Sequence, residues 1–515
     1  MRGMSLERIA KACNGTLVLP LPIEQSLTEA SIQNKDKAGS IAGSENAKSV
    51  CERKICPETE ITSAVLDSRK VTEGALFFAT VGERVDGHKF VSSVFEKGAC
   101  CAVVQKTPKQ VEAEQGVPAD LWGAYILVED TLQALKDIAE YYRSLLTIPI
   151  VGITGSVGKT STKEFIAGVL SEKYQVLKTE GNFNNEIGVP LTLLRIRPEH
   201  EAAVVEMGIS DFGEMHRLSK MVRPTVCVIT NIGQCHLENL KTRDGILKAK
   251  TEIFDYMPEN GEVCLNGEDD KLSTIESVHG KAVHFFGLGG NPAEEVFADH
   301  IENKGLFGSK ALLHFTKGAW EALPIQVTLP GQHMVINAAA AACIGKLLGL
   351  SREQIAEGIC KVAPVGGRSH LIRLEKYEDC TLIDDCYNAN PVSTKAALDL
   401  LSTATNRKMA VLGDMFELGE KEEALHGEVG AYAASLEIDR IVCIGNLSRR
   451  MYEEAKKALD KAGSAKEVLY FATKEEFLKA LEEKKQEWLP EHTILVKASH
   501  GMGFAQIVEF LQEQE

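Results

Sequence analysis

The segment IPIVGITGSVGKTSTKEF, residues 148–165, decides the fold of the middle of the chain. Its first six residues are almost all apolar, which is typical of a buried strand. A glycine-rich turn follows, and beyond it Phe165, Ile166, Val169 and Leu170 recur at helical spacing. A strand, a glycine-rich turn and a helix in this order predict a phosphate-binding loop, where backbone N–H groups at a helix N-terminus hold phosphate oxygens.

Individual roles follow from the chemistry of such loops. Lys159 is expected to reach the β- and γ-phosphates of a nucleotide, and the Thr160 hydroxyl is expected to bind Mg²⁺. The common pattern places a glycine where this chain has Ile153, and here the glycine comes one residue earlier, at Gly152. An ordinary glycine-rich turn remains the alternative. The predicted nucleotide contacts are Gly155, Ser156, Val157, Gly158, Lys159, Thr160 and Ser161.

An acidic residue on a neighbouring strand should complete the metal site. Glu206 ends the apolar run of AAVVEMG, which is a suitable position for a carboxylate that faces Mg²⁺. A glutamate at the end of a strand can also be merely solvated, so Glu206 is indicated mainly by its pairing with the phosphate loop.

Composition limits the classes of partner. The 515 residues suggest about three domains at roughly 150 residues each, and the net charge is −16. This acidity argues against duplex nucleic acid or an anionic membrane as the main partner. The start of the chain lacks the apolar stretch of a signal peptide, and no apolar run approaches the length of a membrane span. Thirteen scattered cysteines without zinc-site spacing are typical of reduced thiols in a cytoplasmic enzyme.

The chain divides into three predicted α/β domains, at 1–147, 148–364 and 365–515. Residues 24–60 are polar and small, and we expect them to form a mobile surface insertion. The central domain should carry a parallel sheet and close with an Ala-rich helix at Asn337–Leu348. In the last domain, strands alternate with helices, which predicts a doubly wound, Rossmann-like sheet. Those strands are expected at 381–384, 409–413, 440–444, 468–471 and 494–497.

Several blocks of sequence, taken in order, resemble the Mur ligase family, the ATP-dependent amino-acid and peptide ligases of bacterial cell-wall precursor synthesis. The early block LDSRKVTEGALFFATVGERVDGHKF is similar to the family's uridine-nucleotide-binding domain. The remaining blocks are VGITGSVGKTSTKE, TEGNFNNEIGVPLTLL, AAVVEMGISDFGE, RPTVCVITNIGQCHLENLKTRDGILKAKTEIF, LPGQHMVINAAAAA, LIDDCYNANPVS, VLGDMFELGE and KASHGMG.

Within the family, the YNANP, NFNNEIGVP and GDMFELGE blocks are most similar to the member that acts last. That resemblance implies an ATP-dependent ligase that joins D-alanyl-D-alanine to UDP-N-acetylmuramoyl-tripeptide through an acyl phosphate, releasing ADP and phosphate. It also implies a monomer that binds neither nucleic acid nor membrane. The tripeptide's third residue, lysine or diaminopimelate, is left open.

The resemblance also implies a pair of Mg²⁺ ions. Thr160 and Glu206 would hold the first ion, His236 would bind the second, and Lys159 would add a fixed positive charge during catalysis. Lys250, in KAKTEIF, matches a catalytic lysine that can carry a carbamate and so orient Mg²⁺. The alternatives are a core histidine with satisfied hydrogen bonds at position 236 and a solvated helix lysine at position 250.

Further contacts are implied by the same resemblance. For ATP, His333 and Asn337 match the adenine contact, Arg368 the phosphate contact and Asp385 the ribose contact. Asn337 could instead cap a helix. An Asn-rich turn is the alternative for Asn182 and Asn185, and a plain Asn-Pro turn is the alternative for Asn390. The predicted substrate contacts are Ser68 and Arg69 for the uridine diphosphate, Asn182 and Asn185 for the muramoyl peptide, and Tyr387, Asn388 and Asn390 for the dipeptide.

Other functions stay open. Another Mur ligase, adding the third residue, would commonly carry a DNPR-type block, which this chain lacks. A folylpolyglutamate or cyanophycin synthetase would not need the uridine-domain block. A P-loop NTPase acting as a switch would need neither the combination of Glu206, His236 and Lys250 nor a third α/β domain.

Overall fold

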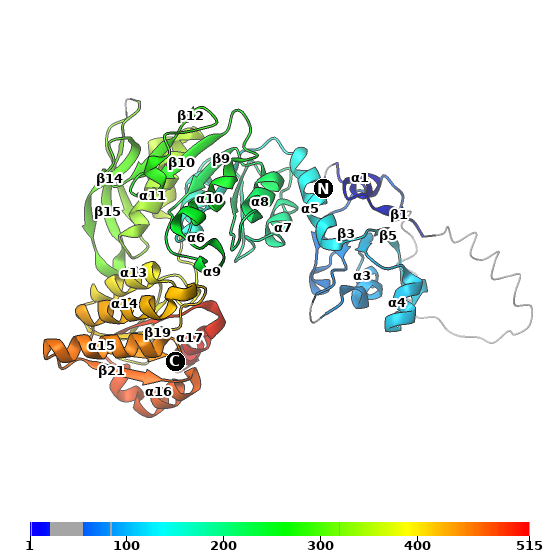
Figure 1. Ribbon diagram of the computed structural model, residues 1–515. Coiled ribbons are helices and arrows are strands. Elements are labelled where there is room, and N and C mark those ends of the chain that lie inside the picture. Colours follow the sequence, from blue (N-terminus) through cyan, green and yellow to red (C-terminus); the bar gives the residue numbers. More distant parts are fainter. Residues whose placement is uncertain (2, 21–54, 83–84, 319, 514–515) are drawn as a thin grey trace, which may run out of the picture. The chain divides into compact units, whose positions relative to one another are not determined.

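The computed structural model describes residues 1, 3–20, 55–82, 85–318 and 320–513 (Figure 1). The chain forms two compact units. The first comprises Met1–Pro149, Thr179–Val205 and Lys220–Arg223, and the second comprises Ile150–Lys178, Glu206–Ser219 and Pro224–Glu515. Within the described residues, no helix has the length and apolar content that a membrane crossing requires.

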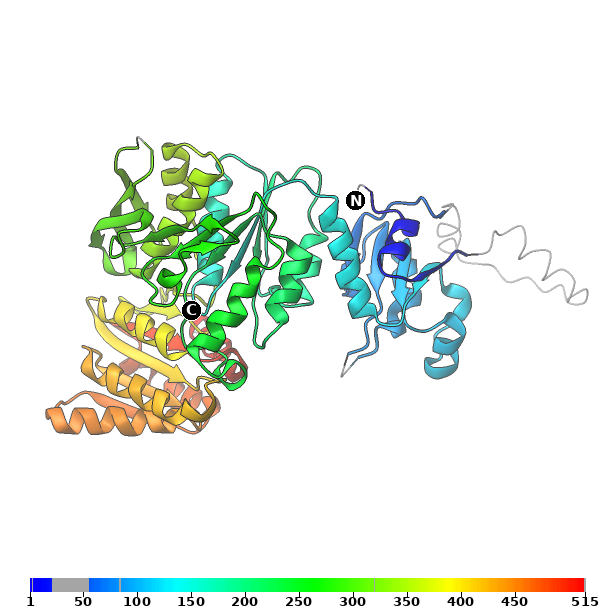
Figure 2. The same cartoon turned by 45° about the horizontal axis from the view of Figure 1, so that its top comes forward.

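The first unit contains a small five-stranded α/β sheet. Its strand order is β1-β5-β4-β3-β2, and all neighbours are parallel except β1 and β5. Helix α5 packs against this sheet through a buried face that includes Leu135 and Ile138 (Figure 2). The strands are β1 (Thr16–Val18), β2 (Ser63–Val65), β3 (Ala75–Phe78), β4 (Cys101–Val104) and β5 (Ala124–Leu127), and the helices are α1 (Leu6–Ala12), α3 (Val91–Glu96), α4 (Pro108–Gln115) and α5 (Thr131–Ser144).

The predicted insertion at 24–60 is too long at its C-terminal end. Residues 24–54 of it lie outside the described residues, but residues 55–60 are held against α1. The N–H of Leu6 donates to the Thr59 carbonyl at 3.0 Å, and the N–H of Glu7 donates to the Pro57 carbonyl at 2.9 Å. The first N–H groups of a helix lack partners within it, so the returning chain satisfies them.

The central sheet has nine strands in the order β16-β15-β14-β13-β10-β9-β6-β8-β7. The pairs β6–β9, β9–β10, β10–β13 and β13–β14 are parallel, and the pairs β14–β15 and β15–β16 form an antiparallel extension. The strands are β6 (Ile150–Thr154), β7 (Val176–Lys178), β8 (Ala202–Glu206), β9 (Val226–Ile229), β10 (Glu262–Asn266), β13 (His284–Gly287), β14 (Glu294–Asn303), β15 (Ser309–Phe315) and β16 (Leu323–Val327).

Helices α6 (Lys159–Leu170), α11 (His333–Leu347) and α12 (Arg352–Cys360) pack together beside this sheet. Helix α11 begins four residues before the predicted Asn337, because Gln332 is its N-cap. Most residues of α11 are buried, and these include all of its alanines. The smallest residues make the closest contacts: a Cβ on Gly358 would lie 2.5 Å from Cα of Val169 in α6.

The C-terminal sheet has six strands in the order β17-β18-β22-β19-β20-β21. All neighbours are parallel except β17 and β18. The strands are β17 (His370–Arg373), β18 (Thr381–Asp384), β19 (Arg407–Gly413), β20 (Arg440–Ile444), β21 (Glu467–Phe471) and β22 (His492–Lys497), and the helices are α13 (Pro391–Ser402), α14 (Glu422–Ser435), α15 (Ser448–Ala462), α16 (Lys474–Trp488) and α17 (Ala505–Glu513).

Two separate apolar cores show that helices cover both faces of the C-terminal sheet. One core joins it to α13, α14 and α15, and the other joins it to α16 and α17 (Figure 1). The predicted α/β class, with a doubly wound C-terminal sheet, is therefore confirmed. All five predicted strands are present, and β17 is an edge strand that the sequence pattern did not reveal.

Candidate active site

The phosphate loop lies between β6 and α6, as predicted. Gly155 has φ 153° and Gly158 has φ 82°, values that favour glycine. A side chain on Gly155 would also place its Cβ 1.9 Å from Oγ1 of Thr230. Asn231 fixes the loop, because its Oδ1 accepts from the N–H of Val157 at 3.0 Å and its carbonyl accepts from the N–H of Ser156 at 3.0 Å. The absence of a side chain at Gly155 therefore lets Thr230 pack directly against the loop backbone.

A pair of buried oxygen ligands lies at the start of α6. The Thr160 hydroxyl oxygen lies 3.0 Å and 3.2 Å from the two carboxylate oxygens of Glu206, to which it donates. Both side chains are buried. The buried ammonium of Lys163 lies 3.9 Å from the same carboxylate and 3.2 Å from Glu164. Glu206 is thus not a solvated strand-end residue. A buried carboxylate beside a hydroxyl is a donor set that suits Mg²⁺.

Lys159 and Lys250, both on helices of the second unit, differ in environment. The Lys159 ammonium donates to the Gly155 carbonyl at 2.9 Å, so it folds over the loop. Lys250 lies in the last turn of helix α10 (Arg243–Thr251) and is only 1% exposed. Burial lowers the pKa of Lys250 to about 8, and the positive charge of Lys159 acts in the same direction. The alternative of a solvated helix lysine at position 250 is therefore wrong.

His236 stands at the start of the short helix α9 (Leu237–Leu240) with φ 49°. Its Nδ1 lies 2.5 Å from Oε2 of Glu417, which follows β19 in the C-terminal sheet. Contact with the imidazole lowers the pKa of the Glu417 carboxyl. The sequence interpretation did not single out Glu417, although it falls within the quoted GDMFELGE block.

The α11 residues divide into one exposed and one buried side chain. His333 is the first residue of the helix and is exposed, whereas Asn337 is 7% exposed. Oδ1 of Asn337 accepts from the Thr162 hydroxyl of α6 at 3.0 Å. Asn337 therefore lies inside the helix and ties it to the phosphate-loop helix, and the alternative that it caps α11 is wrong.

Polar residues of the C-terminal sheet gather at the carboxyl ends of β18 and β22, where ligands bind in doubly wound sheets. The buried ammonium of Lys497 lies 2.6 Å from Oδ2 of Asp385 and donates to the Asn388 carbonyl at 3.0 Å. The guanidinium of Arg368 lies over the ring of Tyr387, 4.1 Å from its centroid. Four predicted ligand residues are thus brought together with Lys497, for which no role was predicted.

Asn390 caps a helix. It is the N-cap of α13, and its Oδ1 accepts from the N–H of Ser393 at 2.9 Å. The amide oxygen of Asn388 accepts from the N–H of Ala389 at 2.9 Å. Asn390 and Pro391 therefore begin a helix rather than form a plain turn. Pro391 occupies the first helical position, where no intrahelical hydrogen bond is lost by its missing N–H.

The remaining predicted residues belong to the first unit. Arg69 is highly exposed and pairs with Asp67 at 2.8 Å, and hydrogen bonds from Arg69 lower the pKa of that carboxyl to about 2. The Ser68 carbonyl accepts from Lys97 at 2.9 Å. Asn182 is exposed, and Oδ1 of Asn185 accepts from two backbone N–H groups at the start of α7 (Gly188–Leu193).

Three contributors were missed by sequence interpretation. Lys163 lies within the quoted GKTSTKE block, but its local sequence does not indicate whether its side chain is buried or exposed. Asn231 lies in TNIGQCH, and only the three-dimensional contact reveals that it holds the loop. The partner of His236, Glu417, comes from the loop after β19, far away in the sequence.

The twelve cysteines that the structure describes are all free thiols. Most are buried, and burial raises the pKa of the Cys386 thiol and of the Cys227 thiol above the ordinary range. Buried, protonated thiols of this kind are packing residues rather than nucleophiles.

Family comparisons cover most of the chain. The family model described as "Mur ligase middle domain" matches residues 153–345. The model described as "Mur ligase, glutamate ligase domain" matches residues 367–500, and the one described as "Mur ligase family, catalytic domain" matches residues 60–143.

Individual proteins are similar over nearly the full length. A Bacillus subtilis (strain 168) protein named UDP-N-acetylmuramoyl-tripeptide--D-alanyl-D-alanine ligase is 36% identical over 459 residues, which cover 88% of this chain and 94% of that protein. The crystal structure of MurF from Acinetobacter baumannii superposes with a TM-score of 0.79 at 30% identity and covers 99% of both chains. The MurF ligase from Thermotoga maritima, solved in complex with ADP, gives a TM-score of 0.72 at 26% identity and covers 88% of this chain and 97% of that chain.

Proposed function

The chain belongs to the Mur ligase family, and from that premise we propose how its residues carry out the reaction. The protein is an ATP-dependent ligase that joins D-alanyl-D-alanine to UDP-N-acetylmuramoyl-tripeptide and so forms the pentapeptide precursor of peptidoglycan. The observation that carries the mechanism is the buried Thr160–Glu206 pair at the foot of a phosphate loop, with Lys159 folded over that loop.

ATP is proposed to bind at the Gly155–Ser161 loop. The loop fits a polyphosphate because the α6 N-terminus presents its N–H groups there. The relative from Thermotoga maritima was solved with ADP, which supports a nucleotide in this fold. Lys159 would exchange its bond to the Gly155 carbonyl for the phosphates, and His333 and Asn337 would border the adenine.

The donor set beside the loop fits Mg²⁺. Thr160 and Glu206 would hold one ion, while His236 and a carbamate on Lys250 would hold a second. When bound, Mg²⁺ supplies positive charge that neutralises the phosphate oxygens. Lys250 is suited to carbamate formation because a buried amine with a pKa of about 8 is neutral more often than a solvated one. His236 would have to give up its contact with Glu417 to bind the ion.

Peptide-bond formation needs an activated carboxylate. The terminal carboxylate oxygen of the tripeptide attacks the γ-phosphorus of ATP, ADP leaves, and an acyl phosphate results. The dipeptide amine then attacks the acyl carbon, loses a proton, and expels phosphate together with the former carboxylate oxygen. The first step brings anions together, so the fixed charge of Lys159 stabilises its transition state. Exclusion of water would protect the acyl phosphate.

Substrate contacts are proposed from the remaining polar residues. Arg368 would leave the ring of Tyr387 to reach the ATP phosphates, and Asp385, held by Lys497, would bind the ribose. The dipeptide would lie against Tyr387, Asn388 and Asn390. The residues proposed for the UDP-muramoyl peptide are Ser68, Arg69, Asn182 and Asn185.

The organisation of the chain is proposed in the same way. We place the uridine-nucleotide domain at 1–147, the ATP-binding domain at 148–364 and the C-terminal domain at 365–515. With these bounds, all strands of each of the three main sheets lie within a single domain. The protein is proposed to act in the cytoplasm, since its two substrates and ATP are soluble metabolites, and as a monomer, as the family resemblance implies. We propose no nucleic-acid or membrane partner.

Phosphate release from Mg²⁺-ATP tests this function. The protein would be supplied with UDP-muramoyl-tripeptide, D-alanyl-D-alanine, both or neither, and the assay repeated with Lys159→Ala. Release that needs both substrates and Lys159 is expected. Release without either substrate would instead indicate a stand-alone NTPase, and release with a UDP-muramoyl dipeptide and a diamino acid would indicate the ligase that adds the third residue.

A further inference from the structure

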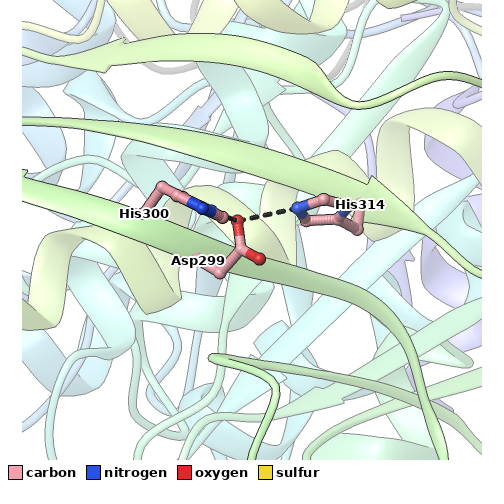
Figure 3. Close-up of side chains that lie close together, drawn as sticks. All are labelled: Asp299, His300 and His314. Carbon is pink, nitrogen blue, oxygen red and sulfur yellow. Dashed lines mark hydrogen bonds and ion pairs between the residues drawn. The ribbon is translucent and has the colours of Figure 1, made fainter.

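Three side chains with metal-binding atoms converge on the antiparallel extension of the central sheet (Figure 3). Oδ1 of Asp299 lies 2.7 Å from Nδ1 of His300 and 2.7 Å from Nε2 of His314. The ligand atoms of all three residues lie within 4.8 Å of one another. Strands β13, β10 and β9 separate β14 from the phosphate-loop strand β6, so this cluster is not part of the proposed ATP site.

A β-bulge explains why neighbours in the sequence share one face. In a regular strand Asp299 and His300 would point to opposite faces. Here the register with β15 shifts between Asp299 and Glu302, and His300 has φ 47°. The bulge and this left-handed residue let the His300 ring lie beside Asp299, as Figure 3 shows.

His314 reaches the same point from the neighbouring strand. It pairs in register with Phe297, two residues before Asp299 on the same face of β14. Diagonal neighbours of this kind are within reach of long side chains. The His314 ring also stacks on Phe297, with centroids 4.8 Å apart, and this contact holds the ring in position.

We propose that Asp299, His300 and His314 form a surface site for a divalent transition-metal ion of the zinc class, which joins the bulge of β14 to β15. Two imidazoles and one carboxylate are ligands that Zn²⁺ takes, with water completing a tetrahedral set. Oxygen-preferring Mg²⁺ and Ca²⁺ are disfavoured by the two imidazoles. His300 is 73% exposed, which leaves a route for the ion and room for the water.

The geometry requires a small adjustment. Ligand atoms at zinc distances of about 2.0–2.2 Å stand roughly 3.3–3.5 Å apart in a tetrahedron, so the two Asp299–imidazole contacts must widen by under about 1 Å. The exposed His300 ring can supply this movement by side-chain rotation. The ion would replace the hydrogen bonds that hold the three side chains together.

Zinc binding to the full-length protein tests the site. Isothermal titration with ZnCl₂, in excess Mg²⁺ and with a non-thiol reductant, would compare the wild-type protein with His314→Ala and His300→Ala. Loss of a ligand should weaken this binding by about 10–100-fold or more, so each variant should bind one ion fewer. Thermal unfolding provides a second readout, because an ion that binds only the folded state raises the Tm.

His279→Ala is the matched control, since it removes an exposed imidazole from the same unit and at a similar φ of 50°. The control should keep both the full zinc stoichiometry and the zinc-dependent rise in Tm. His300→Ala removes a largely exposed side chain, so it should fold even if His314→Ala disturbs the contact with Phe297. Unchanged zinc stoichiometry and an unchanged Tm response in His300→Ala would overturn the proposal.

Discussion

Burial distinguishes three charged side chains of the second unit from ordinary surface charges. Glu206, Lys250 and Lys163 are each at most 2% exposed, although their local sequence is compatible with solvated positions. Charged groups are kept in such places only when they are paired or bind a ligand. The phosphate loop could be predicted from the sequence because its glycines mark positions where the backbone adopts conformations that other residues rarely adopt. The burial of a lysine, in contrast, depends on elements distant in the chain.

Lys250→Ala should lower the rate of the ligase reaction by about 100-fold or more, a loss comparable to removing one group that stabilises the transition state. Lys248→Ala is the matched control, because Lys248 is exposed on the same helix. The rate of phosphate release with both substrates measures the effect. Equal rates for the two variants would rule out a catalytic role for Lys250.

Asn390 can be tested for two roles at once. Asn390→Ala should lower the free energy of unfolding by about 1 kcal/mol, because the cap of α13 is lost. Asn390→Asp keeps a capping oxygen and should preserve stability, but it removes the amide proposed to contact the dipeptide and should raise the KM for D-alanyl-D-alanine. Denaturant unfolding and steady-state kinetics measure the two effects. An unchanged KM in Asn390→Asp would confine this residue to capping.

The helices and strands with a regular pattern of apolar residues were predicted from the sequence, and those with a weaker pattern were missed. Five C-terminal strands are apolar runs that alternate with helices, and all five were predicted, whereas the edge strand β17 was missed. The antiparallel extension formed by β14, β15 and β16 was missed, although β16 alternates buried and exposed residues along its length. The start of α11 was also missed, because Gln332 is a weak signal for a helix cap and the alanines begin later.

The contact between α6 and α12 depends on a glycine. A Cβ at Gly358 would lie 2.5 Å from Cα of Val169 and 2.9 Å from the Gly168 carbonyl, both backbone atoms that cannot yield. Gly358→Ala should therefore reduce the free energy of unfolding by about 1–3 kcal/mol despite the better helix propensity of alanine. Gly427→Ala, where the nearest atom is the flexible Cγ of Glu454, should be nearly neutral. Similar urea midpoints for both variants would contradict this account.

Glu294, at the start of β14, should make stability depend on pH. Burial raises the pKa of Glu294 to about 7, and the Glu268 carboxylate acts in the same direction. The folded protein therefore keeps this proton up to about pH 7, while the unfolded chain releases it near pH 4.5, its ordinary value. Between these values the unfolded state binds fewer protons, so the free energy of unfolding falls as the pH rises.

Glu294→Gln should remove this loss. The variant should gain roughly 1–3 kcal/mol relative to the wild-type protein between pH 4 and pH 8, as measured by urea unfolding at several pH values. The same substitution at the exposed Glu302, on the same strand, should give no such gain. A difference between Glu294→Gln and wild type that does not change with pH would refute the raised pKa.

At the scale of the whole molecule, length and the order of the motifs predicted three α/β domains and the Mur ligase family, and the matches to family models confirm the family. Contacts that join distant segments were beyond the sequence. The pairing of His236 with Glu417 links α9 to the loop after β19, and that of Asp385 with Lys497 links β18 to β22. Both depend on tertiary packing rather than on local pattern.

The path of oxygen in the reaction tests the central claim most directly. UDP-muramoyl-tripeptide labelled with ¹⁸O in its terminal carboxylate would be incubated with the protein, Mg²⁺-ATP and D-alanyl-D-alanine, and the products analysed by mass spectrometry. An acyl-phosphate ligase predicts one ¹⁸O atom in each released phosphate and a precursor extended by the dipeptide. Extended precursor accompanied by unlabelled phosphate would contradict the proposed mechanism.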